Sequence, residues 1–215
     1  MLVKNLMSWP VVTVSNKSTV GEALDLLKRK KIRHLPVVDI NQLILGIVTE
    51  TDLVKVFPNS KELSPFQLNL LSRTPVTKIM VTNPYSVSPN ELIEESALIM
   101  RNKKIGCLPV LDENNKLVGL LSKNDIVDAF ISSLGLEDGG TRITIAINKN
   151  WGFLSKLISL ADKHNVHIQN FVTFDREIVL KLPGKAPDFV NELLKTGYNV
   201  TNISYINPLK KAEAE

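Results

Sequence analysis

The stretch KKIRHLPVVD runs from Lys30 to Asp39, and KKIGCLPVLD runs from Lys103 to Asp112, 73 residues later. The same offset, without a gap over about fifty residues, aligns further identical residues: Met7 with Met80, Glu22 with Glu95, Gly46 with Gly119, and Asp52 with Asp125. Such agreement indicates an internal repeat, in which two copies of one small supersecondary unit pack against each other. Within the quoted stretches the copies differ most where Gly106 replaces Arg33 and Cys107 replaces His34.

Each copy is predicted to fold as β-α-β-β-α. A short β-prone run at 11–15 precedes a helix whose apolar positions fall at i, i+3, i+4 and i+7: Val20, Ala23, Leu24 and Leu27. Two apolar runs, HLPVVD and LILGIVT, then predict a hairpin, with Pro36 expected at a strand start because proline lacks an N–H. A second helix is expected at 50–57 and, in the other copy, at 123–134, with four residues facing inward: Ile126, Val127, Phe130 and Ile131.

The last third of the chain follows a different pattern. RITIAI alternates apolar and polar residues, and WGFLSKLISLADKH predicts a helix with four residues facing inward: Leu154, Leu157, Ile158 and Ala161. Two more strands, a helix and a final strand complete the order βαββαβ, which is the ferredoxin-like split unit. Gly135 is expected to end the preceding helix, and Gly139 with Gly140 to supply a hinge.

The predicted fold class is therefore α/β (α+β), with two repeats packed as a pair and a third domain after them. We expect these boundaries: the first repeat at 1–58, a linker helix within 59–75, the second repeat at 76–134, a linker at 135–140 and the βαββαβ domain at 141–208. Ser64 and Pro65 suit the N-cap and the first position of the linker helix.

The composition excludes several classes of protein. No apolar run approaches the roughly 20 residues that cross a bilayer, and the start of the chain lacks the apolar region of a signal peptide. The single cysteine, Cys107, excludes an intrachain disulfide and a multi-cysteine metal site. The net charge is +4 with both signs interspersed, and the densest basic cluster, residues 28–33, is expected to be a solvated helix end, with an anion contact as the alternative. We expect a cytoplasmic protein that binds neither nucleic acid nor membranes.

The two strand-to-helix junctions, GIVTETD and GLLSKND, carry the most chemistry. In each, a hydroxyl residue is followed three places later by aspartate: Thr49 by Asp52, and Ser122 by Asp125. One interpretation is a capping box, which satisfies main-chain N–H groups at a helix start. The other is a nucleotide site, because the N–H groups of a helix start attract phosphate and a nearby carboxylate can accept the two hydroxyls of a ribose.

Together with IRHLPVVD and IGCLPVLD, these junctions resemble the CBS domain, named for cystathionine β-synthase, from Val3 to about Leu134. The resemblance implies a pair of CBS domains with clefts between them that bind adenosine-containing ligands. Asp125 or Asp52 would hold the ribose, Leu120 would lie against the base, and Arg33 could meet a phosphate. One implied cleft comprises Val12, Arg33, His34, Leu120, Ser122, Asn124 and Asp125. The other comprises Ile47, Thr49, Thr51, Asp52, Tyr85, Gly106 and Cys107. His34 and Cys107 are expected to contribute main-chain atoms.

The C-terminal segment resembles an ACT domain, a regulatory module that often binds amino acids at its first strand-to-helix turn and pairs into larger sheets. In the turn NKNWGFL, Gly152 and Leu154 match the Asp-x-Pro-Gly-x-Leu pattern of that family, whereas Lys149 and Trp151 replace its acid and proline. The resemblance therefore implies the fold and a pairing role, and leaves amino-acid binding open. The order CBS–CBS–ACT resembles the bacterial acetoin-utilisation proteins of the AcuB type.

These residues are compatible with three functions. The leading one is a non-catalytic sensor, in which an adenosyl ligand (AMP, ADP, ATP, NAD or S-adenosylmethionine) acts as a regulatory ligand rather than a catalytic cofactor. An enzyme is disfavoured because no metal-ligand spacing appears and the histidines His34, His164 and His167 are scattered. The third is a structural interaction module with degenerate clefts. A homodimer is predicted, since an ACT-like sheet offers a free edge, and a regulated protein partner is left unidentified.

Overall fold

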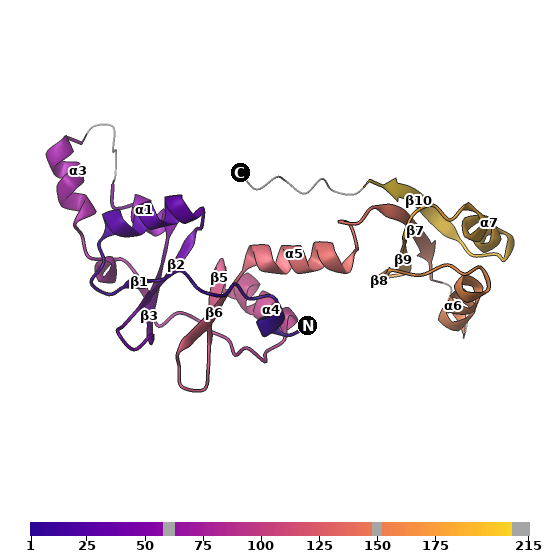
Figure 1. Ribbon diagram of the computed structural model, residues 1–215, viewed down its shortest axis with the longest axis horizontal. Helices are drawn as coiled ribbons and strands as arrows, with labels where there is room; N and C mark the ends of the chain where they lie inside the picture. Colours follow the sequence, from indigo (N-terminus) through magenta and orange to yellow (C-terminus); the bar gives the residue numbers. More distant parts are fainter. Residues whose placement is uncertain (58–62, 148–151, 208–215) are drawn as a thin grey trace. The chain divides into compact units, whose positions relative to one another are not determined.

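The computed structural model describes residues 1–57, 63–147 and 152–207. The chain divides into two compact units, Met1–Ile126 and Val127–Glu215 (Figure 1). Within the ranges just given, the first unit contains two hydrophobic clusters, one for each repeat, and the second unit contains one. The positions Lys149 and Trp151 lie outside the described residues. Among the described residues, no helix has the length and apolar character required to cross a membrane.

The first repeat forms a four-stranded sheet in the order β1 (Val14–Ser15), β2 (His34–Val38), β3 (Ile44–Thr49) and β4 (Val81–Thr82). Its helices are α1 (Val20–Lys30) and the short α2 (Glu50–Val54), and the linker helix is α3 (Pro65–Ser72). Ser64 caps α3 with Pro65 in its first turn, as the sequence predicts. Three hydrophobic residues of α1 are buried against the sheet, which confirms the predicted stripe: Val20, Ala23 and Leu27.

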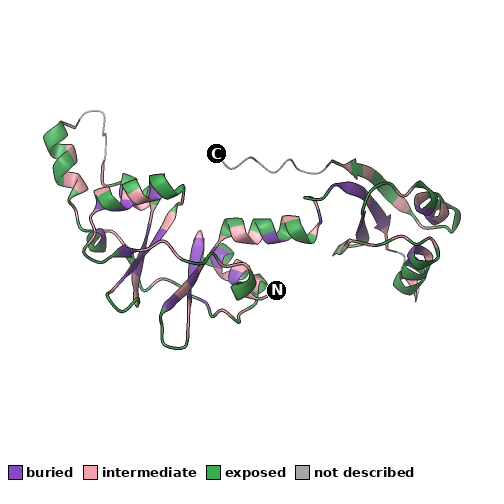
Figure 2. Ribbon diagram, viewed as in Figure 1, coloured by how far each residue is buried: buried purple, intermediate pink, exposed green. Residues whose placement is uncertain are grey.

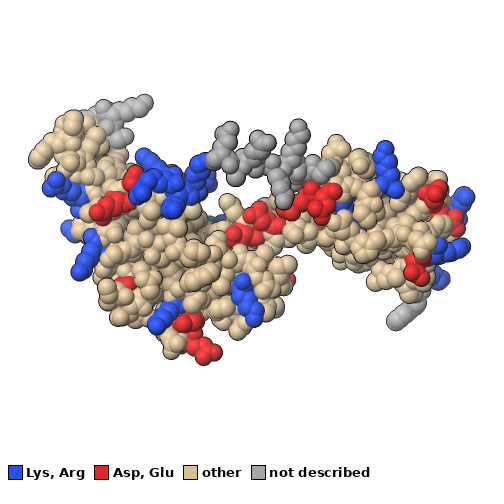
Figure 3. Space-filling model, viewed as in Figure 1, with Lys and Arg blue, Asp and Glu red and all other residues tan. Residues whose placement is uncertain are grey.

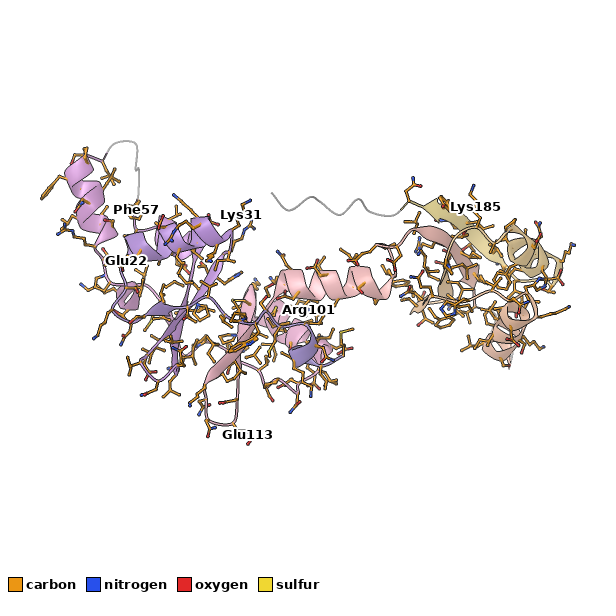
Figure 4. All side chains as sticks on the ribbon, in the orientation of Figure 1. Glu22, Lys31, Phe57, Arg101, Glu113 and Lys185 are labelled. Carbon is orange, nitrogen blue, oxygen red and sulfur yellow. The ribbon has the colours of Figure 1, made fainter. Side chains whose placement is uncertain are left out.

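Helix α1 has a strong signal at each end. Thr19 and Glu22 form a capping box at its start, and Lys31 ends it in a left-handed conformation (Figure 4 labels Glu22 and Lys31). Basic residues fill the last turn, where the helix dipole favours cations: Lys28, Arg29 and Lys30. Figure 3 shows basic side chains gathered over this end of α1, so the expected cationic helix end is confirmed.

The second repeat contains α4 (Ile93–Lys103), β5 (Cys107–Leu111), β6 (Leu117–Ser122) and α5 (Lys123–Ser133). Its hairpin pairs Cys107 with Ser122, just as the first hairpin pairs His34 with Thr49. Both hairpins have an irregularity after the valine that follows proline by one residue, Val37 or Val110. The two copies therefore share register as well as sequence. The predicted β-α-β-β-α order is complete in the first repeat, whereas in the second repeat the first strand is reduced to an isolated bridge between Val87 and Val110.

Pro36 differs from its predicted position at a strand start, and its counterpart Pro109 lies in the same position as Pro36. Pro36 is the third residue of β2, opposite Ile47, and Pro109 is the third residue of β5. In the second repeat the Val87 N–H donates to the Pro109 carbonyl at 3.0 Å, so the main chain of this proline faces Val87 and not the hairpin partner. The missing N–H therefore removes no hydrogen bond from the hairpin, and the strand continues through the proline.

Each repeat is completed by a segment from the other half of the sequence. The Val3 side chain is fully buried in the core of the second repeat, and Ser8 exchanges two main-chain hydrogen bonds with Leu120, at 2.9 and 3.2 Å. In return, Val76 is fully buried in the core of the first repeat, and β4 pairs with β3. The segment that precedes each first strand thus belongs to the opposite core, and the two repeats form one unit.

A methionine and a glycine fit together at each exchange. The Met80 sulfur lies 2.7 Å from where a β-carbon at Gly46 would project, and Met7 occupies the equivalent position against Gly119. Because glycine has no β-carbon, the exchanged segment can lie directly on the strand. The methionine and the glycine that recur in both copies of the sequence therefore contact each other across the copies, Met80 with Gly46 and Met7 with Gly119.

The C-terminal unit has the predicted order βαββαβ. Its elements are β7 (Gly140–Ala146), α6 (Phe153–Lys163), β8 (Asn170–Phe174), β9 (Glu177–Leu182), α7 (Pro187–Lys195) and β10 (Val200–Ile206). The antiparallel sheet has the strand order β10-β7-β9-β8, so the first and third strands of the unit are central. Figure 2 shows the buried residues concentrated in these central strands. The ferredoxin-like fold is thus observed.

Several predicted inward residues are exposed instead. In α6, Leu157 and Ala161 are buried, whereas Leu154 and Ile158 are 43% and 53% exposed. In α5, Val127 and Phe130 are 54% and 50% exposed, because the helix leaves the second repeat after Ile126. A period of 3.6 residues identifies an apolar stripe but cannot say how wide a stripe the neighbouring element covers.

The glycines after α5 match expectation in part. Gly135 ends the helix with φ +64°, as predicted. Gly139 and Gly140, expected to form a hinge, are both buried, and Gly140 is the first residue of β7. Gly140 therefore belongs to the sheet of the C-terminal unit.

Candidate functional site

The two helix-start aspartates form capping boxes with nearly the same geometry. Oδ2 of Asp125 accepts from the Ser122 N–H at 2.6 Å and from the Ser122 hydroxyl at 2.7 Å, and the Asp125 N–H donates to that hydroxyl at 3.3 Å. Oδ2 of Asp52 accepts from the Thr49 N–H at 3.2 Å and the Thr49 hydroxyl at 2.6 Å. The capping interpretation is confirmed. These bonds use Oδ2 alone in both boxes.

The two repeats meet where their sequences differ. The His34 ring, at the start of β2, lies against Gly106, just before β5, with Nε2 2.6 Å from where a β-carbon at position 106 would project. A side chain at position 106 would therefore compete with the imidazole for the same space. The exchange of arginine for glycine between the copies removes a cation from one repeat and also admits the histidine of the other.

The surroundings of His34 are electrostatically mixed. Its pKa is lowered from the ordinary value of 6.5, mainly by burial and next by the Arg33 cation, with a smaller contribution from Lys123. The Asp52 carboxylate acts in the opposite direction. The pKa of His34 is therefore influenced by charges of both repeats: Arg33 and Asp52 in its own repeat, and Lys123, the first residue of α5, in the second repeat. The expectation that His34 contributes main-chain atoms to a cleft stays a prediction.

The thiol of Cys107, the counterpart of His34, is expected to be unreactive. Its side chain is buried, and burial raises the pKa of the thiol to about 12. A thiol in that state is protonated and a poor nucleophile. Across the described ranges, no group of three or more histidine, cysteine, aspartate or glutamate residues could hold a metal ion.

The exchanged segments pair with the strands that carry Leu120 and Ile47. Ser8 is bridged to Leu120, and Val12 follows four residues later, packed on the core of the first repeat. Val81 is paired with Ile47, and Tyr85 follows at the same interval. Tyr85 is 52% exposed, and the Lys103 ammonium lies 4.8 Å from its ring centre. The structure thus brings each segment from one repeat to the predicted strand of the other.

The remaining predicted residues differ in exposure. Arg33, Asn124 and Thr51 are exposed, Ile47 is buried, and Leu120 is half-buried. The boxes, the His34–Gly106 contact and the bridges at Leu120 and Ile47 lie within the first compact unit. No interaction among the described residues joins Arg33 to Asp125.

Sequence reasoning missed one pair of charged residues. Glu50 begins α2 and Lys123 begins α5, and their N–H groups donate to the carbonyls of Arg33 and Gly106, each at 3.0 Å. The two positions are related by the 73-residue offset, so an alignment of charges along the repeat would have revealed them. The second repeat therefore carries a cation where the first carries an anion.

Comparison with known proteins gives a family match over both repeats. The model of the CBS domain matches residues 3–59 and 76–132, which together make up more than half of the chain. These two ranges correspond to the two copies described above. The match ends at residue 132, within α5.

Solved structures give the same result. The structure of an acetoin utilization protein (AcuB) from Vibrio cholerae is 34% identical, with a TM-score of 0.55, over 63% of this chain and 94% of that one. CBSX2 of Arabidopsis thaliana in complex with AMP is 28% identical, with a TM-score of 0.53, over 61% of this chain and 96% of that one. A CBS domain pair in complex with 5′-methylthioadenosine and S-adenosyl-L-methionine is 26% identical, with a TM-score of 0.54, over 61% of this chain and 97% of that one.

Proposed function

The chain belongs to the CBS-domain family, with two CBS domains in tandem, and on that premise we propose that it is a non-catalytic regulatory protein binding adenosyl ligands between them. The observation that carries the proposal is the duplicated helix start, in which an aspartate caps a helix with Oδ2 alone. Oδ1 takes no part in either cap, so it can accept a ribose hydroxyl without loss of the cap; at Asp52 this atom also lies 4.0 Å from the Lys55 ammonium. The AMP complex and the S-adenosyl-L-methionine complex of similar CBS pairs support this ligand class.

In the first proposed cleft, Asp125 holds the ribose, with Ser122 and Asn124 beside it. Val12 and Leu120 enclose the base, which the bridge between Ser8 and Leu120 supports by bringing the segment before Val12 to β6. Arg33 and His34 come from the opposite repeat. The exposed Arg33 guanidinium can form charge-assisted hydrogen bonds with a phosphate.

In the second proposed cleft, Asp52 holds the ribose, with Thr49 and Thr51 beside it. Ile47 and Tyr85 enclose the base, and the main chain at Gly106 and Cys107 closes the opposite wall. The position equivalent to Arg33 has no side chain here, and that equivalent to Lys123 is Glu50. The second cleft is therefore proposed to favour ligands with fewer phosphates.

The C-terminal domain is proposed to be ACT-like and to serve in oligomerisation or signal transmission. Its strand order leaves β10 and β8 at the sheet edges, and a free edge strand can pair with a second copy. We propose a homodimer on this basis. Light scattering should give about twice the 23.9 kDa mass of one chain, and a monomer at all micromolar concentrations would exclude it.

Calorimetry with AMP, ADP, ATP, NAD and S-adenosylmethionine tests the ligand class. Asp125→Ala and Asp52→Ala should each remove one class of binding event while the protein remains folded. Leaving a polar ligand group unpaired costs about 1–3 kcal/mol, so affinity at the altered cleft should fall by about fivefold or more. If the two single variants and the double variant bind every ligand as the wild type does, the aspartates are helix caps only.

The second candidate is a structural interaction module with degenerate clefts. The complete capping boxes favour it, because they account for both aspartates without a ligand. Absence of binding to the whole panel would select this module. An enzyme would instead consume the ligand, so intact ligand after prolonged incubation supports the sensor.

A further inference from the structure

Helix α5 is shared by the two compact units. Its first turn carries Asp125, and Ile126 packs on the core of the second CBS domain. The first unit ends at Ile126 and the second begins at Val127, so the remaining turns of the same helix belong to the C-terminal unit. An α-helix is hydrogen-bonded from turn to turn, so Asp125 and the residues after Val127 are joined by one continuous ladder of main-chain hydrogen bonds.

The last turn of α5 is held by a side chain from the C-terminal sheet. The Asn170 amide, in the first residue of β8, donates to the Ser133 carbonyl at 3.0 Å and to the Ser132 carbonyl at 3.4 Å. The last four carbonyls of a helix have no partner within the helix, and Asn170 supplies one. Gly135 makes this approach possible, because a β-carbon there would overlap the Asn170 side-chain oxygen.

An aromatic contact fixes the same helix one turn earlier. The rings of Phe130 in α5 and Phe174 in β8 meet edge to face, with centres 6.4 Å apart and planes at 75°. Such pairs contribute about 0.5–1.5 kcal/mol beyond their buried area. Phe130, which the apolar periodicity assigns to the core of the second repeat, instead contacts the opposite end of β8 from Asn170.

A buried lysine anchors the segment that follows the helix. Lys181 in β9 is 1% exposed, and its ammonium donates to the Gln169 side-chain oxygen at 3.2 Å. The Gln169 amide in turn donates to the Asp138 carboxylate at 2.7 Å. Lysine is almost never fully buried unless it is paired, so this relay holds Asp138 and the residues around it against the sheet.

We propose that these contacts form a clamp, defined as Asn170, Phe130 with Phe174, and Lys181 with Gln169 and Asp138, through which occupancy of the Asp125 cleft is communicated to the C-terminal domain. The inference rests on the proposed function, since Asp125 must first bind a ligand. A ligand that changes the position of Asp125 acts on the first turn of α5, and the clamp passes that change to β8. Allosteric coupling requires such an element, whose state both sites influence.

Hydrogen exchange of the full-length protein, with and without saturating AMP, tests the clamp. AMP should change the exchange rates of the β8 amides by about fivefold or more, the lower end of typical coupling between sites. Asn170→Ala should keep AMP affinity within about threefold but lose most of the AMP-dependent change in β8. Asn191→Ala, at an exposed position on α7, is the matched control and should respond as the wild type does.

A second variant, Phe174→Leu, removes the ring contact without altering the helix cap, and it should weaken the response in the same way. The fold of each variant is verified by its melting transition. AMP binding without a change in β8, or an unchanged response in both Asn170→Ala and Phe174→Leu, would overturn the clamp alone. Absence of AMP binding to the wild type would overturn the proposed nucleotide function and the clamp with it.

Discussion

The His34 imidazole of the first CBS domain rests on Gly106 of the second, and Nε2 lies 2.6 Å from the position of a β-carbon. Gly106→Ala should therefore force the ring to turn away. Because the ring can rotate, the expected loss is about 1–2 kcal/mol, in the lower part of the range for overpacking. Urea denaturation measures it. In the double variant with His34→Ala the penalty should nearly vanish, and an equal loss in both backgrounds would show that the two residues are independent.

His34 should also make the stability depend on pH. Burial and the Arg33 cation lower the pKa of this histidine below 6.5 in the folded state. Between the lowered pKa of the folded state and about pH 6.5, the unfolded chain therefore binds more protons than the folded chain. The stabilisation is fully present above about pH 6.5 and is lost as the pH falls through the folded-state pKa. His34→Gln should show a smaller loss of melting temperature between about pH 7.5 and 5. Identical profiles for the two proteins would exclude His34 as the source.

The capping box at Ser122 should be measurable without any ligand. Ser122→Ala removes the hydroxyl that accepts from the Asp125 N–H and should destabilise the protein by about 1 kcal/mol, a typical loss for an N-cap. Ser132→Ala, at an exposed site in the same helix, should be close to neutral because alanine favours helix. Thermal denaturation compares the two. A loss of the same size in both would mean that the junction is not stabilised by the cap.

The exchanged segment predicts an effect far away in the sequence. Met7 is only partly buried, so Met7→Ala should cost about 1–2 kcal/mol, less than the 2–5 kcal/mol of a fully buried methionine. The exchange of amides in β5 and β6 should accelerate more than that in β2 and β3. Met80→Ala should give the reverse distribution. Equal acceleration in both hairpins would indicate that the two repeats open together.

Arg33 should distinguish phosphorylated from unphosphorylated ligands. A charge-assisted bond to phosphate contributes about 1.5–3 kcal/mol, so Arg33→Ala should weaken AMP or ATP by about tenfold or more at the Asp125 cleft. Adenosine lacks phosphate and should bind nearly as before. Calorimetry on an Asp52→Ala background isolates this cleft. Equal losses for AMP and adenosine would assign Arg33 to the fold, and no loss for either would return it to a solvated helix end.

Short-range features of the sequence determine much of the order of helices and strands. The 73-residue repeat, the capping signals at Thr19, Ser64, Thr49 and Ser122, and the alternation of apolar residues each act over a few neighbouring residues. Helix caps and strand patterns depend on such short spacings. The β-α-β-β-α units and the βαββαβ order could therefore be predicted from the sequence.

Contacts between segments far apart in the chain were decided only by the tertiary structure. The sequence contains Met7, His34 and Phe130, but nothing in their neighbourhood says that they contact Gly119, Gly106 and Phe174. The apolar stripe of α5 is a single helical pattern, yet its two ends pack in different units. Local periodicity states which face of a helix is apolar, and the packing of the whole chain determines which partner covers that face.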